Sequence, residues 1–383
     1  MILNDNDPKY RQCSLSVMDN IADPHISFDQ NGICNYYYEY LETERNNVFQ
    51  GSEGHRKLQQ LIDEIKLRGK GKDYDCILGV SGGVDSTYLS FKAKEWGLRP
   101  LLVHFDNGWN SELAVQNIQN IVDKTGFDLY TYVVDWNEYR DIQKSFFKAN
   151  VIDIEAIMDI GFTNTLQIIN NKFNIGVVID GNNVVTEAVL PKAWIFKNQD
   201  NLIGIHKKFG NGQLKTYPII TRLQRFKFDN VAKLKCVSPL NFIDYDKKKV
   251  KEIITEEFGW KDYGGKHYES VFTRFYQGYI LPEKFKVDKR KAHLSNLIFS
   301  GQMTKEQAMA ELKQPIYPAE LFSSDRHFVL KKLDFTEGEF DRYLKEPIIS
   351  HLEYGTSVSF WELYPMLKFL RVFVNGIKKI TNE

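Results

Sequence analysis

The arrangement of apolar and polar positions divides the chain into segments with different periods. Apolar side chains recur at helical spacing from Leu58 to Ile65 and the pattern ends at Gly69, which predicts a helix. Short apolar runs without alternation follow, as expected for strands that are covered on both faces. The runs that we expect to be strands are 76–80, 101–105, 129–134, 177–180 and 236–240. The last run contains Pro239, which sheets accommodate mainly at their edges.

Segments with a helical period separate these runs. We expect helices at 86–96, 111–125 and 138–150. Strands that alternate with helices at this spacing indicate an α/β fold with a parallel, doubly wound sheet and right-handed crossovers. Ligands of such sheets bind outside the carboxyl ends of the strands, where the strand order reverses. Functional residues are therefore expected directly after the strands.

Both ends of the chain depart from this alternation. Residues 1–50 interleave Asp, Asn, Gly and Tyr without a helical period, which predicts a small N-terminal module. After about residue 245 the strand pattern fades, and helices are expected at 246–258, at 303–313 and in an apolar-rich tail from 337 to 383. The predicted organisation is a module at 1–50, an α/β domain at 51–255 and a mostly helical region at 256–383 that contacts substrate or a partner.

Composition excludes several classes of protein. The chain has 383 residues, of which 43% are hydrophobic and 26% charged, as in folded proteins of two or three domains. Lysine and arginine (50) balance aspartate and glutamate (50), whereas nucleic-acid binders usually carry a basic excess. The four cysteines are too few for a disulfide framework, and no run approaches the roughly 18 apolar residues of a membrane span. We expect a cytoplasmic protein with no nucleic-acid partner and no membrane insertion.

The first strand leads into the motif Val80-Ser81-Gly82-Gly83-Val84-Asp85-Ser86, where a helix is expected to begin. Adjacent glycines allow backbone N–H groups to close around an anion, and the helix directs the positive end of its dipole to the same place. Asp85 would repel a bare phosphate, so it indicates a bound Mg²⁺ or a capping role. As an exposed loop carboxylate, Asp85 is expected to add little to stability. The motif is neither a Walker A sequence nor GxGxxG, and a capped Gly-Gly turn is the alternative interpretation.

SGGVDS resembles the PP-loop of the N-type ATP pyrophosphatases, which cleave ATP to AMP and pyrophosphate while they adenylylate a carbonyl-type oxygen. The flanking sequence is similar to the N-acetyl sugar amidotransferases of bacterial surface-glycan synthesis, of the WbpG and PseA type. The similar stretches are HFDNGWNSELAVQNIQNIV (104–122), DGNNVVTEAVLPKAW (180–194), IHKKFG (205–210), SPLNFIDYDKKKVKEII (238–254) and WKDYGGKHYESVFTRFYQGYILPEKFKVDKRKAHLS (260–295). The resemblance runs from about residue 9 to 313 and implies a HUP-like α/β domain.

The resemblance implies a specific reaction. The oxygen of an acetamido group on a nucleotide-activated sugar attacks the α-phosphorus of ATP, and pyrophosphate leaves. Ammonia then displaces AMP and leaves an acetamidino group, in the synthesis of lipopolysaccharide O-antigen or flagellin glycan. Adenylylation helps because an amide is a poor electrophile and its oxygen is a poor leaving group. The implied co-substrate and cofactor are ATP and Mg²⁺.

The resemblance also assigns roles to residues. Catalytic roles fall on Ser81, Asp85 and Glu187, with Asp85 and Glu187 as candidate Mg²⁺ ligands. The residues expected to bind ATP are Ser81, Gly82, Gly83, Val84, Asp85, Ser86, Asp106, Asn107, Asp180, Gly181 and Asn182. The residues expected to bind the sugar nucleotide are Lys266, His267, Glu269, Arg274, Arg290 and His293. Asn182 stands where relatives often carry histidine. Trp109 could stack on a ligand or pack in the core. For the charged residues assigned to the sugar nucleotide, the alternative is that they form a solvated helix face.

Cysteine usage bears on zinc and on the source of ammonia. Many relatives carry paired Cys-x-x-Cys knuckles, whereas here Ser16 and Tyr37 stand in place of the partners of Cys13 and Cys34. Two thiolates do not complete a tetrahedral site, so we expect no zinc and a module held by packing of the tyrosines at 36–38. A glutaminase needs an activated cysteine, and none stands in a glycine-rich nucleophile turn. The resemblance implies separate glutaminase and ammonia-channel subunits similar to HisH and HisF, and a homodimer is equally compatible.

Two other functions share the motif. A PP-loop enzyme of the thiolation or lysidine type modifies tRNA, but Cys76 and Cys236 do not offer the cysteine pairing that thiolation usually needs. A nucleotide-binding module without turnover is the other alternative. Production of AMP with an acetamido sugar nucleotide, with tRNA, or with neither distinguishes the three.

Overall fold

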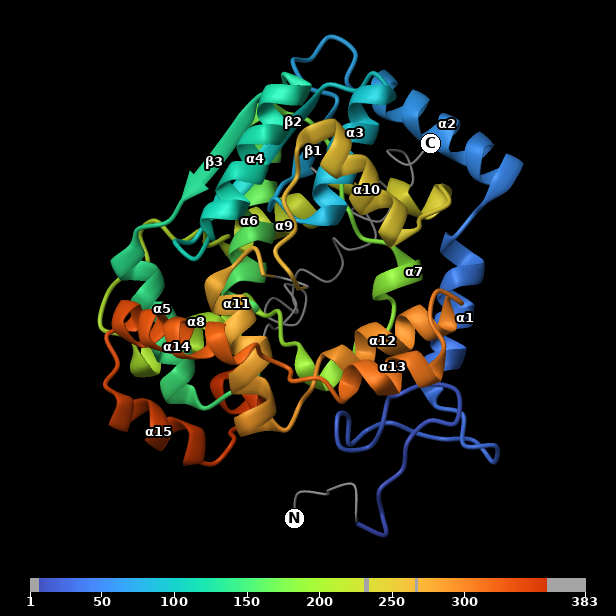
Figure 1. The fold of residues 1–383 in the computed structure, drawn as a ribbon. Helices are drawn as coiled ribbons and strands as arrows, with labels where there is room; N and C mark the ends of the chain where they lie inside the picture. The colour runs from blue at the N-terminus through green and yellow to red at the C-terminus, as the bar shows by residue number, and fades with distance from the viewer. Residues whose placement is uncertain (1–6, 231–233, 266–267, 357–383) are drawn as a thin grey trace, which may run out of the picture.

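The centre of the fold is one sheet of five parallel strands (Figure 1). The computed structural model describes residues 7–230, 234–265 and 268–356. The strands are β1 (Cys76–Gly79), β2 (Pro100–Asp106), β3 (Leu129–Val133), β4 (Val177–Ile179) and β5 (Lys235–Val237), in the order β3-β2-β1-β4-β5. The chain builds outward from β1 to β3 and then returns to the other side of β1. The strand order therefore reverses between β1 and β4, which confirms the predicted doubly wound parallel fold.

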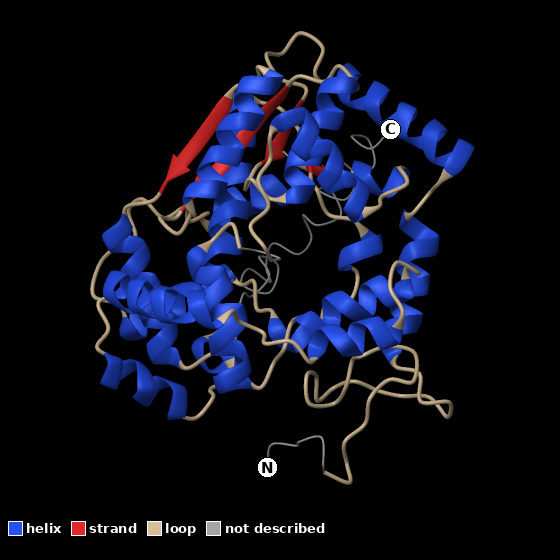
Figure 2. Ribbon diagram, viewed as in Figure 1, coloured by secondary structure: helices blue, strands red, loops and turns tan. Residues whose placement is uncertain are grey.

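Helices cover both faces of the sheet (Figure 2). One face packs on α2 (Gly51–Arg68), α3 (Val84–Glu95), α4 (Glu112–Thr125) and α10 (Lys247–Phe258), and the other on α6 (Ala156–Phe173). Cys76 and Leu78 of β1 belong to the first core, whereas Ile77 between them belongs to the second. Alternate residues of one strand are thus buried in different cores, which explains its continuous apolar run.

Local capping chemistry ends these elements close to the predicted positions. The Ser111 side chain accepts a hydrogen bond from the Ala114 N–H at 3.2 Å, and Gly126 ends α4 with a φ of 73°. β5 ends before Pro239, which begins a short 3-10 helix, so the proline lies outside the strand ladder. The expected helices at 86–96, 111–125, 246–258 and 303–313 are all confirmed within two residues at each end.

The second half of the molecule is helical and lies below the sheet in Figure 1. Its main elements are α5 (Trp136–Ala149), α8 (Gln199–Phe209), α11 (Val271–Phe275), η3 (Tyr276–Phe285), α12 (Arg290–Phe299), α13 (Lys305–Leu312), α14 (Ala319–Leu333) and α15 (Glu337–Lys345). Shorter or peripheral elements are α1 (Asn35–Asn47), α7 (Val184–Glu187), η1 (Lys192–Trp194), α9 (Arg222–Asn230), η2 (Pro239–Phe242) and η4 (His351–Tyr354). No helix within the described ranges is long and apolar enough to cross a bilayer.

One large core joins this helical half to the N-terminal segment. Phe147 of α5 and Phe340 of α15 share it with Cys13, Met18 and Cys34. The divisions predicted at residues 50 and 255 remain predictions, and the tail from 357 to 383 lies outside the described residues.

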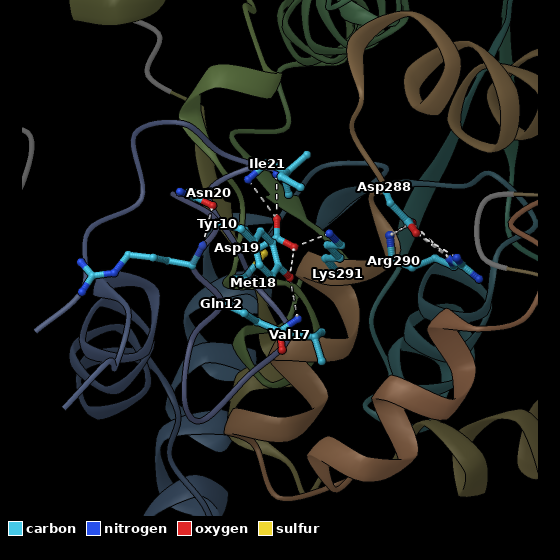
Figure 3. A network of polar contacts seen from close by, with 12 residues as sticks. Tyr10, Gln12, Val17, Met18, Asp19, Asn20, Ile21, Asp288, Arg290 and Lys291 are labelled. Carbon is cyan, nitrogen blue, oxygen red and sulfur yellow. Dashed lines mark hydrogen bonds and ion pairs between the residues drawn. The ribbon is translucent and has the colours of Figure 1, made fainter. Parts of the chain in front are cut away.

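The N-terminal segment is fastened to α12 by a buried ion pair. Asp19 is fully buried and accepts hydrogen bonds from the backbone N–H groups of Ile21 and Ala22. The Lys291 ammonium on α12 donates to the other oxygen of the same carboxylate (Figure 3). Removal of either partner would leave a buried charge uncompensated, so this contact holds the segment in one position.

The cysteines of this segment lie together. The Cys34 N–H donates to Cys13 Sγ at 3.3 Å, and Ser16 Oγ lies 4.0 Å from Cys34 Sγ. Ser16 therefore stands beside the two sulfurs, as the knuckle spacing predicts. In the described part of the chain, no group of three or more His, Cys, Asp or Glu side chains is placed to hold a metal.

The predicted packing of the tyrosines is correct only in part. Tyr36 is buried, and the centroid of the Tyr37 ring lies 5.3 Å from the centroid of the Phe299 ring. Tyr38, in contrast, is 48% exposed, because its position on α1 faces outward, and Tyr40 takes its place in the core.

Candidate active site

The loop after β1 leads directly into α3 and requires glycine. Gly82 has a φ of +77°, and a Cβ there would lie 2.7 Å from the Ala114 carbonyl oxygen. Gly83 is the N-cap of α3, which has no side-chain cap among the described residues. The first turn of α3 therefore offers backbone N–H groups toward the space outside the strand ends, which is the arrangement that binds anions.

The hydroxyl groups of the motif also hold the loop in shape. Ser81 Oγ accepts a hydrogen bond from the Gly83 N–H at 3.2 Å, and Ser86 Oγ donates to the Gly83 carbonyl at 3.2 Å. Thr87 Oγ1 donates to the same carbonyl at 2.8 Å. Ser81 and Ser86 thus have a structural function, and their binding of ATP stays a prediction.

Side chains from distant segments hold the Gly82 carbonyl. Trp260 Nε1 donates to it at 2.9 Å and the Tyr263 hydroxyl at 2.7 Å. Asn117 of α4 in turn donates to the Tyr263 hydroxyl at 2.9 Å. The carbonyl oxygen, which would repel an anion, is therefore bound within the protein. The sequence analysis assigned no role to these three residues, although two of them lie in the WKDYGG stretch of the resemblance.

The loops after β1 and β4 meet where the strand order reverses. A Cβ on Gly181 would lie 3.0 Å from Asp85 Cβ and 3.1 Å from the Asp85 carbonyl carbon, so this close approach requires glycine. Asp180 accepts hydrogen bonds from Ser238 Oγ at 2.7 Å and from the Asn182 N–H at 3.1 Å. Burial raises the pKa of Asp180. These residues lie together, as predicted from their places after the strands.

Asp85 is not the exposed loop carboxylate that the sequence analysis expected. It is half-buried in the first turn of α3, and the buried Tyr245 hydroxyl donates to its Oδ1. The Tyr245 ring packs edge-on against Tyr88 of α3, with 6.1 Å between ring centroids. Burial, then the negative charges of Asp85 and Glu187, raise the pKa of Tyr245. The tyrosine therefore keeps its proton and orients the carboxylate.

The acidic side chains near the loop fit a magnesium ion. Glu187 of α7 adds to the raised pKa of both Asp180 and Tyr245, which places its charge close to both groups. Carboxylate oxygens are the donors that Mg²⁺ prefers, usually one or two together with phosphate oxygens and water. Asp85 and Glu187 are therefore suitable ligands by chemistry and position.

The loop after β2 is held tightly by its own side chains. Asp106 Oδ1 accepts from the Gly108 N–H at 2.9 Å and from Asn110 Nδ2 at 3.2 Å. Asn107 is nearly buried, and its amide donates to the Tyr139 hydroxyl at 3.2 Å and accepts from the Trp109 N–H at 3.1 Å. Its amide therefore shapes the loop. Trp109 is 1% exposed, so of the two interpretations, ligand stacking and core packing, the structure favours core packing.

The residues predicted to bind the sugar nucleotide belong to different segments of the chain. Lys266 and His267 lie outside the described residues. Glu269 lies beside the loop after β1, because a Cβ on Gly83 would be 3.6 Å from Glu269 Oε1. Its position is set by the Ser111 N–H, which donates to the Glu269 carbonyl at 2.8 Å. His293 is half-buried on α12.

The two arginines predicted to bind sugar nucleotide are engaged with protein groups. Arg274 makes paired hydrogen bonds to Asp325 of α14 at 2.5 and 2.6 Å. Arg290 pairs with Asp288 at 2.9 Å and donates to the Gln314 carbonyl beyond α13 at 2.9 Å. Each guanidinium thus connects its own helix to a neighbouring segment through hydrogen bonds to protein acceptors. This geometry favours a role in holding the helices together.

The fold and the loop define a class: a doubly wound α/β protein with a glycine-rich loop at the reversal of strand order. Residues 269–368 match the family described as LPS biosynthesis protein WbpG-like, C-terminal domain.

The chain also aligns with two further proteins. The uncharacterized protein MJ1599 of Methanocaldococcus jannaschii is 22% identical over 330 residues, which span 84% of this chain and 99% of that protein. The NMN synthetase of Francisella tularensis aligns over 58% of this chain and 91% of that one, with 15% identity and a TM-score of 0.28.

Proposed function

We propose that the protein is an ATP-dependent amidotransferase that converts an acetamido group of a nucleotide-activated sugar to an acetamidino group. The observation that carries the proposal is the meeting of two loops, where Gly181 packs against Asp85 beside the uncapped end of α3. This arrangement suits a pyrophosphate. The WbpG-like domain at 269–368 supports a substrate from lipopolysaccharide synthesis or a related surface glycan.

Each group at the site has a function in this reaction. The N–H groups of the loop and of the first turn of α3 bind the pyrophosphate portion of ATP. Asp85 and Glu187 hold Mg²⁺, which when bound offsets the charge of the phosphates. Tyr245 keeps the Asp85 carboxylate in one orientation. Gly181 lets the loop after β4 approach the loop after β1 closely, since a side chain there would contact Asp85.

The chemistry proceeds in two displacements. The acetamido oxygen forms a bond to the α-phosphorus, and the bond to pyrophosphate breaks, with the leaving charge received by the loop N–H groups. Ammonia then forms a carbon–nitrogen bond, the carbon–oxygen bond to AMP breaks, and one proton is released. Preorganised donors at the leaving group are effective because they do not need to reorient during the reaction.

The thiols of the chain support a separate source of ammonia. Cys76 is fully buried in β1, and burial raises its pKa and that of Cys236. Hydrogen bonds from Cys34 lower the pKa of Cys13 to about 5, but the Cys13 side chain has no exposed surface. An accessible, activated thiolate is needed to hydrolyse glutamine. We therefore propose that a glutaminase partner supplies ammonia, so that ammonium salts but not glutamine support the isolated chain.

The test measures release of AMP and pyrophosphate from ATP, with Mg²⁺ and ammonium, across a panel of acetamido sugar nucleotides and unmodified tRNA. We expect AMP with one sugar nucleotide only, together with a product in which oxygen is replaced by NH. Asp85→Asn should abolish release, whereas the control Asp123→Asn, on the exposed face of α4, should not. AMP with tRNA alone would identify a tRNA-modifying enzyme, and ATP binding without AMP would identify a binding module.

A further inference from the structure

The ammonium group of Lys332, on α14, lies against the loop that follows β2. Lys332 Nζ donates a hydrogen bond to the Gly108 carbonyl. It also lies 4.8 Å from the Trp109 ring centroid, 4.6 Å from Trp136 and 5.4 Å from Phe328. A cation over aromatic faces is attracted to them, and more strongly when water is excluded. The ammonium is therefore held by one carbonyl and three rings, although α14 is more than 200 residues from this loop in sequence.

Lys332 is half-buried beside a negative charge. Burial lowers the pKa of Lys332, while the negative charge of Asp106 opposes this effect. Asp106 is a residue of the loop itself and accepts the Gly108 N–H at 2.9 Å. The carboxylate and the ammonium thus bind the N–H and the carbonyl of the same residue, Gly108.

The loop has little room to rearrange around this contact. Gly108 has a φ of +81°, and a Cβ there would lie 3.0 Å from the Trp136 ring and 3.8 Å from Lys332 Nζ. The segment that opens the WbpG-like domain also holds the loop, because the Val271 N–H donates to the Trp109 carbonyl at 3.0 Å. The C-terminal region therefore fixes the loop at two points.

We propose that Lys332 is a positioning residue for the nucleoside of ATP, acting through the loop Asp106–Asn110. This inference rests on the proposed function, and it extends that function: the loop after β1 binds the pyrophosphate, and we assign the nucleoside to the loop after β2, where the resemblance implies that Asp106 and Asn107 bind ATP. Loss of the Lys332 ammonium removes the hydrogen bond to the Gly108 carbonyl and the cation–π contacts to Trp109 and Trp136. Nucleoside recognition is then weakened, while pyrophosphate recognition, which depends on Gly82 and Gly83, is unchanged. The assignment gives the C-terminal domain a direct part in the ATP site.

Isothermal titration of the full chain with MgATP and with magnesium pyrophosphate tests this role. Lys332→Met should weaken binding of ATP about tenfold, or about 1.4 kcal/mol, and change that of pyrophosphate by less than about twofold. Lys332→Arg retains the charge and the donors and should retain ATP affinity. The matched control is Lys331→Met, on the exposed neighbour in the same helix, which should bind both ligands as the wild type does.

The outcomes separate this inference from the proposed function. Equal weakening for ATP and pyrophosphate, or no change for ATP, would overturn the role of Lys332. A wild-type chain that binds neither ligand would overturn the proposed function itself. Lys332→Gln keeps a donor for the Gly108 carbonyl without the charge, and should weaken ATP binding in the same direction if Lys332→Met does not fold.

Discussion

Replacement of Asp85 should destabilise the protein as well as abolish activity. Asp85→Ala removes the acceptor of the Tyr245 hydroxyl, and Tyr245 is only 4% exposed. A buried hydroxyl without a partner costs about 1–3 kcal/mol. The substitution also removes a negative charge close to Glu187, and this relief offsets part of the loss. We expect a net decrease of about 1–2 kcal/mol in the free energy of unfolding.

A double-mutant cycle isolates the contribution of this hydrogen bond. Urea unfolding of Asp85→Ala, Tyr245→Phe and the double variant gives the coupling between the two side chains. We expect the double variant to be more stable than Asp85→Ala, because the phenyl ring no longer needs an acceptor. The coupling should be about 1–2 kcal/mol. Effects that add within about 0.3 kcal/mol would refute the reasoning, since they would show that the hydroxyl does not depend on the carboxylate.

Three further predictions follow from packing and burial. Gly181→Ala should abolish AMP release, because the added Cβ would lie 3.0 Å from Asp85 Cβ. The circular dichroism spectrum should stay that of the wild type, and turnover at the wild-type rate would contradict the close approach. Arg274→Met should lower the free energy of unfolding in urea by about 3 kcal/mol, because the buried Asp325 would lose its only cationic partner among the described residues and keep the Tyr317 hydroxyl alone. An unchanged midpoint would leave Arg274 available for ligands. Burial raises the pKa of Asp153 to about 7, well above its value in the unfolded chain. The native state therefore binds the extra proton between the two pKa values, so wild-type stability falls as the pH rises from about 4 to about 7 and is level above that. Asp153→Asn lacks this decline, so its stability relative to the wild type should increase from about pH 4 to about pH 7; parallel pH profiles in urea unfolding would contradict this.

The sequence by itself determined the sheet and the place of the anion site. Apolar runs and helical periods are local properties, and the glycines of SGGVDS restrict the backbone wherever they occur. Parallel strands bring their carboxyl ends to one edge, so the proximity of Asp85 and Gly181 was predictable from their positions after β1 and β4.

The tertiary structure decided which side chains serve the loops and which serve the fold. The donors to the Gly82 carbonyl, Trp260 and Tyr263, are about 180 residues away in sequence, and no local pattern indicates such a partner. Arg274 is suited equally to a phosphate and to Asp325, and only the docking of α14 assigns it to the carboxylate. In the sequence, Lys332 likewise cannot be distinguished from a surface lysine, and only the position of α14 brings it against Gly108. The chemistry of a charged side chain is encoded in its residue type, but its partner depends on the packing of distant elements.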